Sequence, residues 1–290
     1  MSLRQTGFSV FSDWTCRWLR IRGIILFIRC ARQRSIMSRI EINTLAKTFD
    51  GRDVLDDVSL TIEPGRSLAL IGPTAAGKTV LLKCLVGLYA PDRGEILIDG
   101  ENVSQPDARE QQLDDRIGML FQQNALFDSL AVWENIGFRL MARGATRAEA
   151  RARAEELLPQ VGLPISTADL FPADLSGGMQ KRVGFARAVA TSPDILLLDN
   201  PTAGLDPILA ARIDATISEL ARKNGATVIS ATGNMVGLTQ AYDDIAVLHD
   251  GVLRWHGSAK TAAGESNPWL GQLLSGSREG PIETINFEAH

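Results

Sequence analysis

Apolar and polar residues alternate along three stretches of the first hundred positions, at residues 40–45, 58–62 and 95–99. A period of two places apolar side chains on one face of a strand and polar ones on the other. The pattern therefore predicts three strands, each buried on one face only.

Three further strands are predicted by apolar runs without alternation, at residues 67–71, 195–199 and 226–230. Runs of this kind are typical of strands that are covered on both faces. The second run ends in the carboxylate of Asp199. These segments predict the centre of a sheet rather than its surface.

Helical patterns occupy much of the remaining chain, first from about residue 124 to 180. Thr146 and Glu149 have the spacing of a capping box, and the apolar positions after them fall on one helix face: Ala150, Ala154, Leu157, Leu158 and Val161. Residues 207–223 predict a second long helix that ends at Asn224 and Gly225. Past Gly251 we expect only short and irregular structure.

A glycine-rich segment links the strand at 67–71 to a helical run. It matches the phosphate-binding loop pattern G-x-x-x-x-G-K-[ST], and its residues are Gly72, Pro73, Thr74, Ala75, Ala76, Gly77, Lys78 and Thr79, followed by Val80 at the start of the helix. Backbone N–H groups and the positive end of the helix can then bind the β- and γ-phosphates of a nucleotide. Lys78 would neutralise phosphate charge and Thr79 would ligate Mg²⁺. Average residue usage gives this pattern by chance in about one per cent of chains of this length.

Length and composition suit one large α/β domain with an inserted subdomain, since the chain has 290 residues and is 45% hydrophobic. No segment has the eighteen or more apolar residues that a membrane span needs, so we expect any transport path to lie in another chain. Cys16, Cys30 and Cys84 have no metal-ligand spacing, which favours a reduced, cytoplasmic protein.

Residues 1–36 differ from the rest, with seven arginines, no lysine and one acidic residue, Asp13, in a chain whose net charge is −4. They show neither helical nor strand periodicity that matches the remainder. Three interpretations stay open: a basic anchor at a membrane surface, a targeting segment, or a start codon assigned too early, with Met37 as the natural start. We therefore divide the chain into an extension (1–36), a main domain (37–257) and a tail (258–290).

Further motifs follow the phosphate loop in a fixed order. They are Gln122 after an apolar run, Leu175-Ser176-Gly177-Gly178-Met179-Gln180 before a helical run, Asp199, and Ala203-Gly204-Leu205-Asp206. In this order and spacing the chain resembles ATP-binding-cassette (ABC) ATPases over residues 40–252. The resemblance implies an α/β P-loop fold with a parallel core sheet, an antiparallel β subdomain and a helical subdomain at about 124–180.

The same resemblance implies a site shared by two chains. In this family two cassettes meet head to tail, so that Ser176, Gly177 and Gly178 of one chain cover ATP held by the phosphate loop of the other. Asp199 would hold Mg²⁺ through water, Gln122 would contact the metal and report the γ-phosphate, and Asp206 lies in the loop after Asp199. Phe49 stands where the family stacks an aromatic ring on adenine, and its alternative role is that of a core or turn aromatic.

Two positions depart from the family pattern. Asn200 replaces the glutamate that polarises the attacking water, and Gly233 replaces the histidine of the switch segment. A general base typically contributes 10²- to 10⁴-fold to a rate, so we expect an intact binding site with weakened hydrolysis. A slow ATPase is our first interpretation, and a nucleotide-gated dimer with negligible turnover is the alternative.

Residues 120–136 and the end of the chain, 272–282, are similar to ATPases of the Mla/Mce phospholipid-transport group of Gram-negative bacteria. This similarity implies a homodimer at the cytoplasmic face of the inner membrane, peripheral to a permease pair, with a periplasmic lipid-binding partner. We expect Phe127, Leu130 and Trp133 to contact the permease, or else to form subdomain core. Transport of another solute is the alternative. Nucleic-acid-linked ABC proteins are not favoured, because the sequence has neither a second cassette nor a long coiled-coil insertion.

Overall fold

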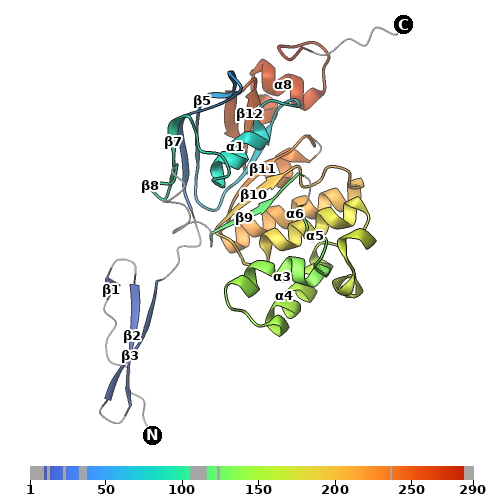
Figure 1. The fold of residues 1–290 in the computed structure, drawn as a ribbon. Coiled ribbons are helices and arrows are strands. Elements are labelled where there is room, and N and C mark those ends of the chain that lie inside the picture. The colour runs from blue at the N-terminus through green and yellow to red at the C-terminus, as the bar shows by residue number, and fades with distance from the viewer. Residues whose placement is uncertain are drawn as a thin grey trace. The chain divides into compact units, whose positions relative to one another are not determined.

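The computed structural model describes residues 38–104, 116–122, 125–235 and 237–283, together with the backbone of three strands that precede residue 38 (Figure 1). The chain divides into two compact units, Met1–Ile36 and Met37–His290. Among the described residues no helix is both long and apolar enough to span a membrane.

The first unit is a three-stranded antiparallel sheet of β1 (Val10–Phe11), β2 (Trp14–Ile21) and β3 (Ile24–Arg32). Strand β2 pairs with β3 from Trp14 opposite Arg32 to Ile21 opposite Ile24. The sequence analysis finds no strand periodicity here that matches the remainder, so it does not predict these strands. The run of β-branched and aromatic residues in β2 and β3 is the signal for strands, even though it does not alternate with polar residues.

The second unit is built on a six-stranded sheet in the order β13-β12-β6-β11-β10-β9. Its strands are β6 (Ser67–Ile71), β9 (Ile117–Leu120), β10 (Ile195–Asp199), β11 (Thr227–Ala231), β12 (Asp244–His249) and β13 (Val252–Ser258). All neighbouring pairs are parallel except β12 with β13, which is antiparallel. The predicted parallel core sheet is therefore confirmed.

Both faces of this sheet are covered, which explains the apolar runs. Along β6, Leu68 and Leu70 belong to one buried cluster, whereas Ala69 and Ile71 belong to another. Strand β10 divides in the same way, with Ile195 and Leu197 on the first side and Leu196 and Leu198 on the second. Because successive side chains point to opposite faces, a strand between two cores is apolar at nearly every position.

The first core lies under a four-stranded antiparallel sheet in the order β5-β4-β7-β8, with helix α1 (Lys78–Leu85) contributing to it. The strands are β4 (Ile40–Phe49), β5 (Arg52–Ile62), β7 (Arg93–Ile98) and β8 (Glu101–Asn102). Ile40, Ile42, Leu60 and Ile62 are buried, and their alternation is the pattern predicted from the sequence. This is the predicted antiparallel β part of the fold.

The second core is covered by helices α3 (Val132–Ala142), α4 (Arg147–Gln160), α5 (Gly177–Val189) and α6 (Pro207–Asn224) (Figure 1). Short 3₁₀ turns at Ile165–Asp169 and Pro172–Asp174 join α4 to α5. The capping box is confirmed, because the Thr146 hydroxyl accepts from the Glu149 N–H and the Glu149 carboxylate accepts from the Thr146 N–H. The five predicted face residues of α4 are all buried.

The end of the chain is more regular than the sequence analysis expects. Past Gly251 it has β13, a 3₁₀ turn at Ala262–Gly264 and helix α8 (Pro268–Ser275), and a short helix, α7 (Leu238–Ala241), precedes β12. The expectation of irregular structure past Gly251 is wrong. The signals for α8 are an Asn267 cap, a proline at its first position and Gly276 in the left-handed conformation after its end.

Deleting residues 1–36 should leave the second unit folded, because it has its own two buried cores. We expect a chain that starts at Met37 to be monodisperse, with a midpoint of thermal unfolding within about 4 °C of the full chain, a shift worth about 1 kcal/mol or less. Differential scanning calorimetry measures this. Aggregation of the shortened chain alone would show that the extension supports the domain.

Candidate functional site

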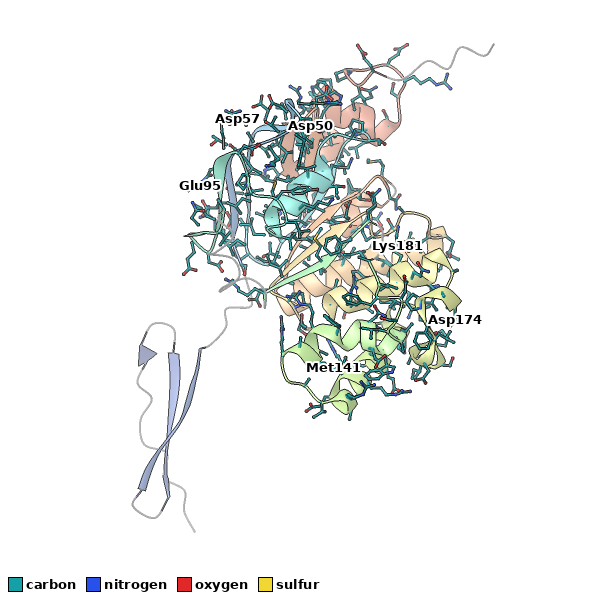
Figure 2. All side chains as sticks on the ribbon, viewed as in Figure 1. Asp50, Asp57, Glu95, Met141, Asp174 and Lys181 are labelled. Carbon is teal, nitrogen blue, oxygen red and sulfur yellow. The ribbon has the colours of Figure 1, made fainter. Side chains whose placement is uncertain are left out.

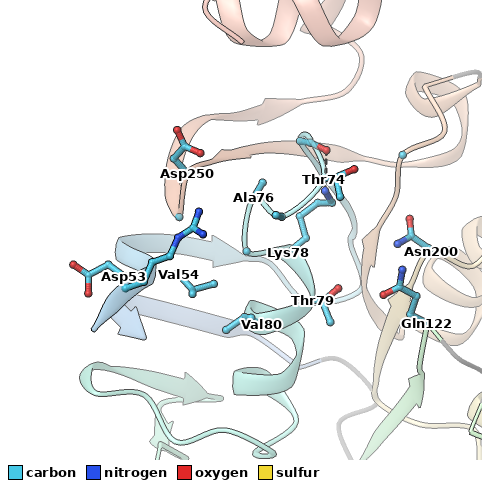
Figure 3. Close-up of a pocket in the computed structure, with 16 residues that line it drawn as sticks. Asp53, Val54, Thr74, Ala76, Lys78, Thr79, Val80, Gln122, Asn200 and Asp250 are labelled. Atoms are coloured by element: carbon cyan, nitrogen blue, oxygen red, sulfur yellow. Dashed lines mark hydrogen bonds between the residues drawn. The ribbon is translucent and has the colours of Figure 1, made fainter. Parts of the chain in front are cut away.

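A cavity of about 790 Å³ opens where the phosphate loop joins β6 to α1 (Figure 3). The loop needs glycine at both ends. Gly77 has φ +99° and a Cβ there would lie 2.7 Å from the Val54 carbonyl oxygen, while a Cβ on Gly72 would lie 2.0 Å from that of Leu248. Glycine at these two positions therefore lets the loop backbone pack closely against its neighbours, in a loop whose type binds phosphate through its backbone amides.

Lys78 begins α1 and lies inside the cavity. Its ammonium donates to the carbonyl oxygens of Gly72 at 2.8 Å and Pro73 at 2.7 Å, so the side chain folds back over its own loop. Burial lowers the pKa of Lys78, and the nearby Asp199 carboxylate partly offsets that effect. A cation held in this way is aimed at the position that phosphate oxygens take in such a loop.

Asp199 ends β10 and is 1% exposed. Burial raises the pKa of its carboxyl group, while a hydrogen bond from Thr79 and the charge of Lys78 act in the opposite direction. The described residues contain no group of three or more His, Cys, Asp or Glu side chains that could hold a metal by themselves. A cation bound beside Thr79 and Asp199 would therefore need oxygen ligands from a nucleotide or from water.

Gln122, Asn200 and Gly233 also line the cavity, and Figure 3 shows the side chains of Gln122 and Asn200 close together on one wall. Asn200 has φ +53°, donates its N–H to the Ala231 carbonyl at 2.8 Å and donates Nδ2 to Asp199 at 3.3 Å. A Cβ on Gly233 would meet no atom within 4 Å. The wall thus offers an amide where a base is expected, and space where an imidazole is expected.

Five residues of the lining are absent from the sequence-based prediction: Arg52, Asp53, Val54, Asp250 and Gly251. They come from the start of β5 and from the turn between β12 and β13, which lie far from the motifs in sequence. The backbone hydrogen bond from Asp56 to Gly251 brings these two segments together. Nothing in the local sequence marks them as site residues.

Phe49, predicted to stack on adenine, is not among the residues that line the cavity. Its ring packs edge-to-face on Tyr89 with 5.1 Å between centroids, and the Lys47 ammonium lies 5.4 Å from its centroid. Pro73 and Asp199 are likewise outside the lining, although they contact Lys78 and Thr79 there.

The signature residues lie outside the cavity as well. Ser176 caps α5, its hydroxyl accepting the Met179 N–H at 3.3 Å, and a Cβ on Gly177 would meet nothing within 4 Å. Asp206 caps α6 by accepting the N–H groups of Ile208 and Leu209. The surface at Gly177, the first residue of α5, is therefore open.

Comparison with known proteins gives the family of this site. A family model described as "ABC transporter" matches residues 55–203, which span the phosphate loop, the signature and Asp199. The chain belongs to the ABC transporter family. The predicted α/β P-loop fold is confirmed by solved cassettes: a dimeric ATP-binding cassette in a post-hydrolysis state bound to ADP and Pi has a TM-score of 0.72 at 31% identity, over 76% of this chain and 98% of that one.

Two curated relatives are ATP-binding proteins of named transport systems. The intermembrane phospholipid transport system ATP-binding protein MlaF of Escherichia coli (strain K12) is 34% identical over 252 residues, which are 86% of this chain and 93% of MlaF. The probable ribonucleotide transport ATP-binding protein mkl of Mycobacterium tuberculosis (strain ATCC 25618 / H37Rv) is 36% identical over 245 residues, 84% of this chain and 68% of mkl. The chain is thus an ATP-binding subunit of the ABC ATPase type.

Lys78→Ala should weaken ATP binding at least tenfold, because it removes the ammonium that lies among the phosphate-binding amides. A tenfold loss corresponds to about 1.4 kcal/mol. Isothermal titration with ATP measures it, and Lys260→Ala, an exposed lysine of the same chain, is the matched control. Equal affinity in Lys78→Ala and the control would contradict the assignment of this cavity.

Proposed function

We propose that this chain is the ATP-hydrolysing subunit of a transporter that moves phospholipid between membranes. The supporting observation is the match to MlaF, which covers 86% of this chain and 93% of that relative. An ABC transporter for another solute is the second candidate, favoured by the similar identity to mkl. The ATPase does not select the cargo, so the proposal concerns the complex in which it acts.

We infer that the working unit is a homodimer. The cavity of one chain holds the phosphate loop but none of Ser176, Gly177 and Gly178. A helix that begins with a serine cap and two glycines presents free N–H groups to an anion. A second copy placed head to tail would bring these groups to the open side of the nucleotide, and the dimeric state of the solved relative supports this arrangement.

Mg²⁺ fits the chemistry of the site. Thr79 supplies a hydroxyl oxygen and Asp199 a buried carboxylate, and Mg²⁺ prefers oxygen ligands from one or two carboxylates together with water and substrate phosphates. When bound, the ion would neutralise charge that develops on the phosphate oxygens. Lys78 and Gln122 would position the γ-phosphate and the attacking water beside it.

We further propose that hydrolysis is slow. Asn200 can hydrogen-bond a water but cannot accept its proton at neutral pH, and Gly233 has only its backbone to offer. Positioning and electrostatic stabilisation still come from Lys78, the metal and the partner's signature, and these supply most of phosphoryl-transfer catalysis. The dimer with bound ATP should therefore be long-lived, and a dimer that opens mainly by nucleotide exchange is the limiting case.

The permease would dock on the helical layer formed by α3 to α6, near the loop that follows Gln122. There Phe127 is 44% exposed and Phe138 is 41% exposed, and their rings lie 4.7 Å apart. Trp133, the third residue considered for this surface, is only 7% exposed and belongs to the core, where Arg147 lies over its ring. The alternative role of Trp133 as subdomain core is the one that the structure supports.

Two side chains hold this surface in place. Buried Asn135 accepts the Phe127 N–H at 2.8 Å and donates to the carbonyls of Phe127 and Leu130. Arg187, on the signature helix α5, donates to the Ala125 carbonyl at 2.7 Å. A displacement of Phe127 would thereby move α5, which begins at the signature residues. This route would link a permease to the nucleotide.

Each part of the chain then has a role in the proposal. Residues 37–257 form the ATPase domain, with a helical subdomain at about 124–180, and residues 258–290 form a tail. We place the protein at the cytoplasmic face of the inner membrane, held there by the permease, with a periplasmic lipid-binding partner in the same complex. Residues 1–36 would add a basic membrane contact.

The variant Asn200→Glu with Gly233→His should raise turnover about 10²-fold, because it restores a base and a switch histidine. The Gly233 position has room for the new side chain, but Glu fits the left-handed backbone at position 200 less well than Asn. Asn200→Gln with Gly233→His is the matched control, since Gln imposes the same strain without a base. Phosphate release is the measurement, and equal rates in the two variants would show that another group serves as base.

Phe127→Asp should reduce co-purification of the ATPase with its permease at least tenfold, because it puts a charge into the proposed apolar contact. Leu88→Asp is the control, since Leu88 is 56% exposed and lies beyond α1 rather than on the helical layer. ATP affinity should stay unchanged in both variants. Normal co-purification of folded Phe127→Asp would place the docking surface elsewhere.

A further inference from the structure

A second cavity, of about 660 Å³, lies between helix α6 and the segment that follows β11. Its polar lining comes from Asp214 and Ser218 on α6, from Asn234 and Gln240 on the opposite segment, and from Thr202 before α6. Alanines of α6 form much of the remaining wall, and their small side chains leave room for a ligand. It is separate from the nucleotide cavity, because the two share no lining residue.

Asp214 is the one ionisable residue of this lining. Burial raises the pKa of its carboxyl group to about 6, while a contact with the Tyr242 hydroxyl partly opposes the shift. The residues that line the cavity with Asp214 include neither lysine nor arginine. A carboxylate that has lost hydration without gaining a cation is an unfavourable arrangement, which a bound cation would relieve.

Two buried hydroxyl groups lie behind Asp214. Tyr242 is 4% exposed and Ser230 is fully buried, and both interact with this cluster. Neither Tyr242 Oη nor Ser230 Oγ has a hydrogen bond of good geometry. Burial and the charge of Asp214 raise the pKa of Tyr242, so its hydroxyl stays protonated and neutral.

We propose that this cavity is a ligand site for a small organic cation that carries a guanidinium or alkylammonium group. Asp214 would accept its charged N–H groups, and the amide oxygens of Asn234 and Gln240 are further acceptors. The alanine wall suits a short alkyl chain. Anions are disfavoured, because the lining has a carboxylate and neither lysine nor arginine.

Occupancy of this cavity would be linked to the nucleotide site. Thr202 and Leu205, in the loop after Asn200, line the second cavity. Asn234 is the neighbour of Gly233, which lines the nucleotide cavity. The Asn234 N–H donates to the Thr232 hydroxyl at 3.0 Å. A ligand that orders either segment changes the free energy of nucleotide binding, and by linkage the nucleotide changes the affinity of the ligand equally.

The test uses butylguanidinium and its neutral isostere butylurea as probes with the full-length protein at pH 7.5. We expect saturable binding of butylguanidinium by ligand-observed NMR, with affinity at least tenfold greater than that of butylurea. Asp214→Asn should lose this difference between the two probes. Ala211→Leu fills the cavity from an exposed helix position and leaves the carboxylate in place, so it should abolish binding of both probes.

Circular dichroism and unchanged ATP affinity without probe verify that both variants are folded. Equal binding of the two probes to the wild type, or undiminished binding to Ala211→Leu, would overturn the site. Saturating butylguanidinium should change the ATP affinity of the wild type at least twofold and leave that of Asp214→Asn unaltered. Identical ATP affinities with and without the probe would overturn the linkage.

Discussion

The burial of the parallel sheet on both faces is the constraint on which the rest of this structure depends. Five strands run in the same direction between two cores, so their carboxyl ends meet at a single edge, and each supplies the nucleotide cavity there. Gly72 follows β6, Gln122 follows β9, Asn200 follows β10, Gly233 follows β11 and Asp250 follows β12. This is the position where open α/β sheets generally bind ligands, and it gives chemistry to residues that are far apart in sequence.

The sequence predicts those parts of the site that each depend on a short segment. The phosphate loop is local, since its glycines, lysine and helix start lie within eight residues, and Asp199 is marked by the apolar run before it. Arg52, Val54 and Gly251 reach the cavity only because a β5 backbone group pairs with the β12–β13 turn. No local pattern carries that pairing. In the same way, the sequence predicts the helical subdomain, but the exposure of Phe127 and the burial of Trp133 depend on which distant segments pack against them.

The two departures from the family pattern differ in physical kind. Asn200 has a left-handed backbone and its amide bonds to Asp199, so asparagine suits the conformation as well as the hydrogen bond. At Gly233 the change only removes a side chain, because the space around it is empty and its backbone does not require glycine. The first change is therefore built into the local fold, whereas the second removes a side chain and leaves the fold unaltered. Under the proposed slow hydrolysis, both would reduce proton-transfer chemistry while Lys78 and the phosphate loop stay in place.

If hydrolysis is slow as proposed, control of turnover passes from the chemical step to the assembly of the two chains. The nucleotide cavity of one chain includes none of the signature residues, and a Cβ on Gly177 would meet no atom within 4 Å. With the weak base proposed above, the lifetime of the closed pair would depend on how helices α3 to α6 and the segments after β10 and β11 are held. Asn135 and Arg187 bond to the loop before α3, and the cavity around Asp214 borders the segments after β10 and β11. On this proposal, the residues that adjust turnover would lie around the nucleotide site rather than within it.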